Sequence, residues 1–276
     1  MNISYSSYRR YLDCPRRYHY EDIKKKPKVE ESAYFKLYGL LMEAFFKRYT
    51  NDLSKSGKEL SETGIKGILF KMWEKILDDN YVDWGDPWVR ETSSQIFERA
   101  YQDVLKNLKA FSFWGESKSE ITIDVLLKKT RDLVTGRLDF LWNRPAGGVE
   151  ILDGKGTNKI ETNVDVEQLY FYALLYLLHH GRLPNKIGFL FYRYQIIKYI
   201  DFDMDTIVTF KDKVSAVKKL IKADKVFLPK VGLSKQCKWC PYRFECDAYA
   251  SKRAANAEKR KVKIEALENS LGVIEL

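Results

Sequence analysis

The sequence lacks the features that would send a chain into or across a membrane. No apolar run approaches the length of a bilayer-spanning helix, and the first residues, Met-Asn-Ile-Ser-Tyr-Ser-Ser, contain neither the basic segment nor the apolar core of a signal peptide. Internal repeats and low-complexity tracts are missing as well. These absences predict an intracellular, cytoplasmic protein without a membrane partner, and both nucleoid association and a viral origin fit this prediction.

Cysteine is scarce, but its spacing is informative. The chain has 4 cysteines. Cys14 stands near the start, and Cys237, Cys240 and Cys246 form a C-x2-C-x5-C pattern near the end. A reducing compartment disfavours structural disulfides, whereas four thiolates can hold either a 4Fe–4S cluster or a tetrahedral zinc ion. Spacing alone does not separate these two cofactors. We therefore expect a four-cysteine site that joins the two ends of the chain.

Acidic residues are outnumbered by basic ones. The 276 residues carry 48 Lys and Arg against 38 Asp and Glu, a formal net charge of +10, and the pI is about 9.2. Such an excess favours a polyanionic partner such as nucleic acid, although it can equally serve solubility alone. The hydrophobic share of 45% and the aromatic share of 14% predict a globular protein with a substantial core.

The hydrophobic pattern divides the chain into a helical part followed by an α/β part. We expect a helix from Ser4 that Pro15 ends, followed by a loop. Apolar residues at helical spacing then predict helices over 33–49, 65–79, 88–111, 163–179 and 205–223, while alternation and turn residues predict strands over 119–127, 134–142, 149–153, 187–192 and 195–200. A basic tail helix should follow, carrying Lys252, Arg253, Lys259, Arg260, Lys261 and Lys263.

Two aspartates and a lysine gather in the predicted hairpin. Asp139 and Asp153 lie symmetrically about Ala146 in the turn, so they should be neighbours on adjacent strands. Lys155 follows two residues later and should share the face of Asp153. Paired carboxylates suit Mg²⁺ or Mn²⁺, and a metal with a lysine beside it can hydrolyse a phosphodiester bond. Taken singly, each residue could equally be an ordinary strand-end or solvated side chain.

The order of the motifs strengthens the hypothesis that these residues hydrolyse a phosphodiester bond. Gly136-Arg137-Leu138-Asp139, Asp153-Gly154-Lys155 and Gln168-x-x-x-Tyr172, preceded by Tyr5-Ser6-Ser7-Tyr8 and Cys14-Pro15-Arg16-Arg17-Tyr18, resemble the motifs of RecB-like PD-(D/E)xK nucleases from residue 4 to about 249. The resemblance implies a restriction-endonuclease-like α/β core, a central mixed sheet flanked by helices, with an N-terminal helical region and a C-terminal cysteine region. The expected parts are an N-terminal helix with the first cysteine (1–32), a helical region (33–115), the nuclease core (116–232), the iron–sulfur cysteine loop (233–250) and a basic C-terminal tail (251–276).

The resemblance also implies roles for individual residues. Asp139 and Asp153 would bind the metal, Lys155 would be the catalytic lysine, and Gln168 with Tyr172 would lie beside the substrate strand. Many relatives carry a histidine four residues after the position of Gly39, as a further metal ligand. This chain has Glu43 there, which remains a competent ligand for a hard cation. Glu120 could be a DNA-facing carboxylate or a solvated strand end.

The cysteine pattern resembles the iron–sulfur staple of AddB-type and CRISPR-associated RecB-like exonucleases. A structural 4Fe–4S cluster on the four cysteines is therefore implied, with zinc as the alternative. Together these features predict a metal-dependent DNA exonuclease for single-stranded or frayed ends. Two alternatives stay open: a structure-selective or sequence-specific endonuclease, and a DNA-holding subunit with protein partners in a recombination, replication or CRISPR-adaptation assembly.

Overall fold

A computed structural model describes residues 1–28, 31–53, 55–56, 60–84, 91–128, 130–157, 159–160, 164–230, 237, 240–252, 258 and 262. The chain divides into two compact units. Unit 1 comprises Met1–Tyr5 and Glu30–Lys218, and unit 2 comprises Ser6–Val29 and Lys219–Leu276. Unit 2 therefore combines an N-terminal segment with the C-terminal segment, and unit 1 contains every residue predicted to take part in hydrolysis.

Unit 1 is built on a 6-stranded mixed sheet with the order β1-β5-β6-β7-β8, in which β4 also pairs with β5. Parallel pairs join β1 to β5 and β6 to β7, and the other pairs are antiparallel. The strands are β1 (Asn2–Ile3), β4 (Ser117–Leu127), β5 (Asp132–Asn143), β6 (Val149–Lys155), β7 (Lys186–Phe191) and β8 (Ile196–Ile200). The three-strand run from β4 to β6 confirms the predicted meander.

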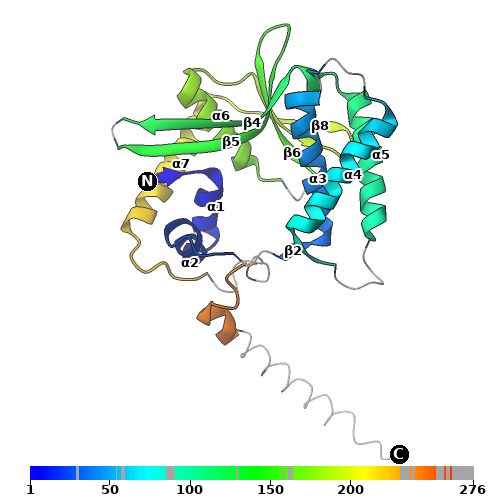
Figure 1. The fold of residues 1–276 in the computed structure, drawn as a ribbon. Coiled ribbons are helices and arrows are strands. Elements are labelled where there is room, and N and C mark those ends of the chain that lie inside the picture. The colour runs from blue at the N-terminus through cyan, green and yellow to red at the C-terminus, as the bar shows by residue number, and fades with distance from the viewer. Residues whose placement is uncertain are drawn as a thin grey trace, which may run out of the picture. The chain divides into compact units, whose positions relative to one another are not determined.

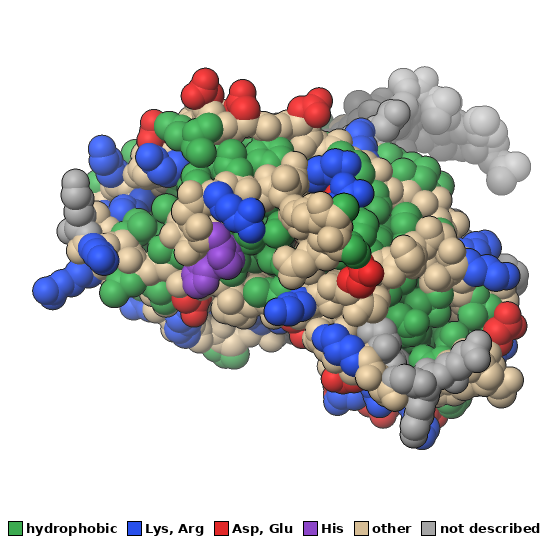
Figure 2. Space-filling model, turned by 90° about the horizontal axis from the view of Figure 1, so that it is seen from above, with side chains coloured by type: hydrophobic (Ala, Val, Ile, Leu, Met, Phe, Trp, Pro, Cys, Tyr) green, Lys and Arg blue, Asp and Glu red, His purple; other side chains and the backbone are tan. Residues whose placement is uncertain are grey.

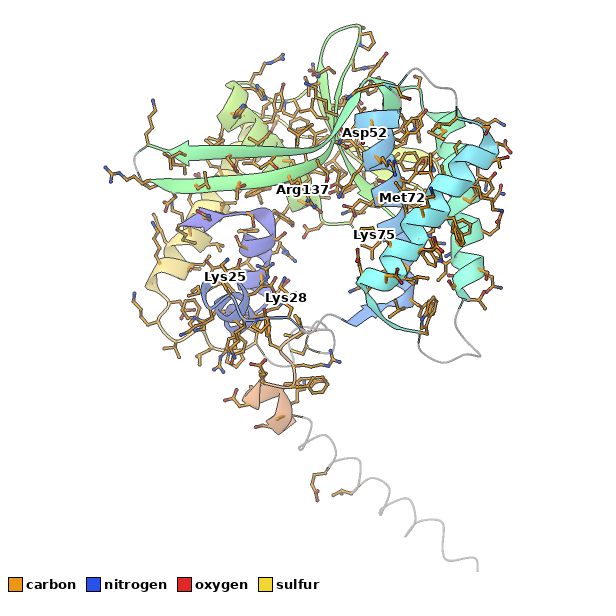
Figure 3. All side chains as sticks on the ribbon, in the orientation of Figure 1. Lys25, Lys28, Asp52, Met72, Lys75 and Arg137 are labelled. Carbon is orange, nitrogen blue, oxygen red and sulfur yellow. The ribbon has the colours of Figure 1, made fainter. Side chains whose placement is uncertain are left out.

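Three helices of unit 1 pack on one another and on the sheet (Figure 1). These are α3 (Tyr34–Arg48), α4 (Glu62–Asp79) and α5 (Ser93–Ala110), accompanied by the short segments η2 (Tyr49–Leu53) and η3 (Phe113–Gly115). Leu41, Trp73 and Val104 meet Phe140 and Leu152 of the sheet in one buried core. Met72 of α4 packs against this core, whereas Lys75 on the same helix is exposed (Figure 3).

Local signals explain where these helices begin. Ser61 accepts a hydrogen bond from the Gly64 amide at the start of α4, and Thr92 with Gln95 forms a capping box before α5. The capping box places the first residue of α5 at Ser93, later than the predicted start at residue 88. A parallel pair of short strands, β2 (Glu31–Ala33) and β3 (Tyr81–Asp83), was not predicted.

Helix α6 (Val166–His180) packs against β4, β5 and β6, and it ends at Gly181 in the left-handed conformation. Helix α7 (Met204–Ala223) then follows β8. The prediction of an α/β fold, a mixed sheet flanked by helices, is confirmed. No helix in the described part of the chain combines the length and apolar composition needed to cross a bilayer.

In unit 2, Pro15 begins a helix where the sequence predicted a loop. Helix α1 (Tyr5–Asp13) ends just before Cys14, as predicted, but Pro15 opens a new helix, α2 (Pro15–Tyr18), which continues as the π-helical turn η1 (His19–Ile23). Proline is favoured at the first helical position because the amide that it lacks has no partner there. The expected loop after Pro15 is therefore wrong: the chain stays helical to Ile23.

The N-terminal and C-terminal segments of unit 2 contact each other. Tyr11 donates a hydrogen bond to Asp224 at 2.9 Å, and Lys230 donates to the backbone oxygen of Leu12 at 2.6 Å. The ring of Phe227 lies against Tyr18 and His19, with centroid distances of 6.3 and 4.7 Å. Most of the predicted basic tail helix, including Arg253, Lys259, Arg260, Lys261 and Lys263, lies outside the described residues.

Candidate active site

The hairpin of β5 and β6 brings the two predicted aspartates together. Phe140 pairs with Leu152 and Leu141 with Ile151, the register that the symmetry about the turn predicted. Asp139 and Asp153 are the next opposed positions, and the Gly154 amide donates a hydrogen bond to Asp139 Oδ2 at 3.0 Å. Asp153 is 1% exposed, so its negative charge would cost free energy in the folded protein unless a cation or hydrogen-bond donors compensate it.

Two glycines of the motifs are required by packing. A Cβ on Gly136 would lie 2.4 Å from Leu175 Cδ1 of α6, so this glycine lets the helix approach the strand. A Cβ on Gly154 would lie 2.1 Å from the hydroxyl oxygen of Tyr192, which is 1% exposed. Tyr192 was not predicted, and its hydroxyl has no hydrogen-bond partner among the described residues.

Lys155, Gln168 and Tyr172 form a chain of polar contacts that starts at Asp153. Lys155 Nζ lies 2.5 Å from Asp153 Oδ2 and donates a hydrogen bond to Gln168 Oε1 at 3.2 Å. Gln168 Nε2 in turn donates to the Tyr172 hydroxyl at 2.8 Å. The spacing of four residues puts Gln168 and Tyr172 on one face of α6, as the sequence predicted. Five of the predicted residues thus meet in one site.

Burial and mutual repulsion disfavour two charged aspartates. Burial, then the charges of Asp153 and Glu43, raise the pKa of Asp139 to about 8. Burial also raises the pKa of Asp153, although the Lys155 ammonium opposes this effect. A pair of carboxylates that is costly to ionise in a buried site is the arrangement that a divalent cation stabilises.

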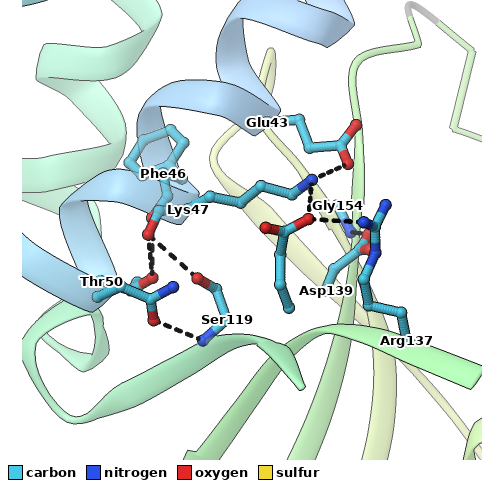
Figure 4. A network of polar contacts seen from close by, with 10 residues as sticks. Glu43, Phe46, Lys47, Thr50, Ser119, Arg137, Asp139 and Gly154 are labelled. Atoms are coloured by element: carbon cyan, nitrogen blue, oxygen red, sulfur yellow. Dashed lines mark hydrogen bonds and ion pairs between the residues drawn. The ribbon is translucent and has the colours of Figure 1, made fainter. Parts of the chain in front are cut away.

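Glu43 lies on α3 but is bound to a lysine. Lys47 Nζ lies 2.8 Å from Glu43 and 2.6 Å from Glu120, and Arg137 lies 3.0 Å from Glu120 (Figure 4). Glu43 is nevertheless close enough to contribute to the raised pKa of both aspartates. Its ion pair with Lys47 was not predicted, although the i,i+4 spacing of the two residues is one that pairs opposite charges on a helix.

Glu120 occupies an unusual backbone conformation. Its φ of +54° is in the left-handed region, which non-glycine residues adopt rarely. The pairing of β4 with β5 is interrupted there, opposite Asp139, and resumes on both sides. Hydrogen bonding to Lys47 lowers the pKa of Glu120, so this carboxylate is held ionised beside the site. A solvated strand end does not describe it.

The donor set fits a hard divalent cation held by two residues. Asp139 and Asp153 supply adjacent oxygen ligands, which Mg²⁺ accepts together with water and substrate oxygens. Within the described residues, no group of three or more His, Cys, Asp or Glu side chains converges on one metal position. Glu43 in its ion pair with Lys47 therefore does not complete the set.

The four cysteines of unit 2 line one cavity. Cys14, Cys237, Cys240 and Cys246 face it together with Arg16, Arg17 and Arg243, and all four thiols are free and half-buried. Burial raises the pKa of the Cys240 thiol. A shared cavity with basic neighbours suits four thiolates, although no metal position is defined by the described side chains.

Basic side chains do not gather in one patch on the face of the molecule that Figure 2 shows. In Figure 2, Lys and Arg side chains are scattered among apolar, neutral and acidic ones. Composition alone therefore does not locate a nucleic-acid surface, and the site has to do so.

Comparison with known proteins agrees with this geometry. The family model described as "PD-(D/E)XK nuclease superfamily" matches residues 2–247. The chain belongs to this superfamily and is a DNA nuclease by family. Nucleases of this superfamily generally use divalent metals such as Mg²⁺ or Mn²⁺.

Two solved structures resemble the chain at low sequence identity. A structure named "Putative exonuclease" from Eubacterium rectale is 14% identical with a TM-score of 0.50, covering 86% of this chain and 87% of that one. The structure of SSO0001 is also 14% identical, with coverage of 90% and 86% and a TM-score of 0.39. No curated protein matches the sequence.

Proposed function

We propose that the chain is a metal-dependent DNA exonuclease that hydrolyses phosphodiester bonds at single-stranded or frayed ends. The observation that carries the hydrolytic part is the buried pair Asp139 and Asp153 with Lys155 at 2.5 Å from Asp153. The choice of an exonuclease rests on the RecB-like order of the motifs, and the name of the Eubacterium rectale structure agrees with it.

Asp139 and Asp153 would hold Mg²⁺ or Mn²⁺, and Glu43 would become a further ligand only in a metal-bound state in which it turns from Lys47 toward the ion. The bound ion would supply Lewis acidity and a water of lowered pKa. Asp153 keeps Lys155 in place, so its ammonium can donate a hydrogen bond to the attacking water or to the phosphate oxygens on which negative charge grows. Gln168 accepts from Lys155 and fixes its direction, while Tyr172 orients the Gln168 amide.

The deciding experiment incubates purified protein with end-labelled linear single-stranded DNA, linear duplex and closed circular single-stranded DNA. Mg²⁺ or Mn²⁺ is present with and without chelator. We expect short products from linear single strands, slower attack on duplex, and intact circles. Cleaved circles would indicate the endonuclease alternative, and binding without metal-dependent cleavage of any substrate would indicate a DNA-holding subunit.

We also propose that Cys14, Cys237, Cys240 and Cys246 hold a structural 4Fe–4S cluster. The supporting observation is that all four line one cavity beside three arginines. Anaerobically purified protein should be brown and contain iron and inorganic sulfide. Stoichiometric zinc without iron would overturn the cluster and leave the four-cysteine site. The cytoplasmic location and the protein partners expected from the sequence remain predictions.

A further inference from the structure

A cleft of about 760 Å³ in unit 1 adjoins the candidate active site at Glu43. Its volume is in the range of a ligand site, and charged side chains from α3, from α5 and from the turn after β7 line it alongside apolar ones such as Leu40. The basic ones are Lys36, Arg99 and Arg193. The motifs do not include any of these three residues, and hydrolysis as described above does not use them.

The two arginines are held by the same tyrosine. Both guanidinium groups lie over the ring of Tyr38, Arg193 at 4.2 Å and Arg99 at 5.2 Å from the ring centroid. Tyr38 is itself fixed, since it is 1% exposed and donates a hydrogen bond to Asp103 at 2.8 Å. The arginines are therefore positioned before any ligand arrives, which reduces the entropy lost on binding.

The positive charge at this point is only partly neutralised. Arg99 forms an ion pair with Glu91, but Arg193 pairs with no carboxylate among the described residues and donates only to the Gly156 backbone oxygen, at 3.0 Å. Burial and the neighbouring charge of Arg193 lower the pKa of Arg99. Two like charges kept this close, one of them without an acidic partner, favour an anion.

The cleft is continuous with the catalytic strand because two glycines meet. A Cβ on Gly156 would lie 2.7 Å from Gly39 Cα, so the segment directly after Lys155 runs along the backbone of α3. Gly39, Gly156 and Thr157 all line the cleft. A polymer whose phosphate sits at Lys155 would therefore find the arginines along its path.

We propose that this cleft binds the phosphates of the single DNA strand next to the scissile bond, with Arg193 and Arg99 as positioning residues. Guanidinium groups suit this task because they bind phosphate oxygens in pairs and keep their charge. Lys36 adds a third cation at an exposed position. The proposal rests on the nuclease function proposed above and names the residues that hold its substrate.

The test measures binding and turnover of Arg193→Gln, with Lys75→Gln as the matched control. Lys75 is an exposed lysine of α4 that does not line the cleft, and its substitution removes one positive charge in the same way. The probe is a fluorescein-labelled single-stranded oligodeoxythymidylate with Mg²⁺. Binding is measured in an Asp153→Ala background by fluorescence anisotropy, from about 50 to about 200 mM salt.

We expect Arg193→Gln to raise the Kd about tenfold and to reduce the slope of log K against log salt by about 0.7, the amount for one lost contact to a single strand. In the active protein KM should rise while kcat changes less than about twofold, as for a contact that binds ground and transition state alike. Arg193→Lys should restore the salt slope but only part of the affinity, because lysine lacks the paired donors.

Glu91→Gln tests the proposal in the other direction, because it should not raise the Kd for DNA. It removes the acid that competes with phosphate for Arg99, so DNA should bind at least as tightly as to the wild type. Thermal unfolding of each variant shows whether folding is retained. If Arg193→Gln does not fold, Lys36→Gln replaces it, with the same expected loss of salt slope.

The outcomes separate the two proposals. If the wild type cleaves DNA but Arg193→Gln matches Lys75→Gln in Kd and salt slope, the cleft proposal is overturned while the nuclease function stands. A weaker Glu91→Gln complex would also contradict it. If the wild type neither binds nor cleaves the oligonucleotide, both proposals fail.

Discussion

The contact between Gly154 and Tyr192 gives a sharp prediction about the active-site strand. In Gly154→Ala, the new Cβ would lie 2.1 Å from the Tyr192 hydroxyl oxygen and 2.7 Å from Cζ. Tyr192 cannot easily move, since its ring stacks on Phe46 with centroids 5.3 Å apart, and its backbone oxygen accepts from Asn107 at 2.7 Å. Overpacking at such a position should lower the free energy of unfolding by about 3 kcal/mol.

The partner substitution should act in the opposite direction. The Tyr192 hydroxyl is buried without a hydrogen-bond partner among the described residues, so Tyr192→Phe should stabilise the protein by about 1 kcal/mol. The double variant should recover part of the loss from Gly154→Ala, because the oxygen is gone while Cζ remains at 2.7 Å. We expect a coupling energy of about 1 kcal/mol.

Urea unfolding followed by tryptophan fluorescence measures these effects, because Trp114 stacks on Phe46 at 4.0 Å in the same core. DNA cleavage is measured in parallel. Gly154→Ala should reduce cleavage, since a clash with Tyr192 that displaces the strand would also move the amide that donates to Asp139. A Gly154→Ala protein as stable as the wild type, or a double variant whose loss equals the sum of the single effects, would refute the packing argument.

Further substitutions test the charges. Asp153→Ala should abolish cleavage and leave DNA binding and folding largely intact; wild-type turnover would remove this residue from the site. Lys155→Ala should abolish cleavage but retain metal binding, as calorimetry would show. Glu43→Gln should weaken metal affinity, and normal cleavage at limiting metal would end its role as a ligand. Cys14→Ser should lower the melting temperature and the iron content, whereas unchanged stability would refute the staple. Folding raises the pKa of Asp139 from 3.8 to about 8, so between these pH values the folded state binds more protons than the unfolded state. The free energy of unfolding of the metal-free protein should therefore fall as the pH rises from 3.8 to about 8. With Mg²⁺ present, the free energy of unfolding should no longer fall in this way with pH. An equal fall with pH in metal-free Asp139→Asn would show that Asp139 is not the group responsible.

Much of the site was predictable because strand pairing follows local rules. The turn around Ala146 fixes the register in which Phe140 pairs with Leu152, and Asp139 and Asp153 are each one position further along their strands. Helical spacing likewise predicted that Gln168 and Tyr172 share a face. These inferences need only the period of a strand or a helix and the centre of a turn, which the sequence contains.

Other features depend on tertiary contacts that carry no periodic signal. The Tyr192 hydroxyl fills the space that Gly154 leaves free, and the Arg193 guanidinium lies over the ring of Tyr38 on α3. The left-handed backbone of Glu120 could not be expected, since glutamate has no preference for that conformation. The helix after Pro15 was missed because proline both ends and begins helices.

Lys47 connects the predicted ligand Glu43 to the unforeseen carboxylate Glu120. If Glu43 left Lys47 to bind the proposed metal ion, a half-buried Lys47 ammonium without another partner would be costly. Glu120 removes this cost, because it stays 2.6 Å from Lys47 and is itself anchored by Arg137. The left-handed backbone of Glu120 places this second carboxylate beside Lys47, so Lys47 would keep an acidic partner if Glu43 bound a metal ion as proposed.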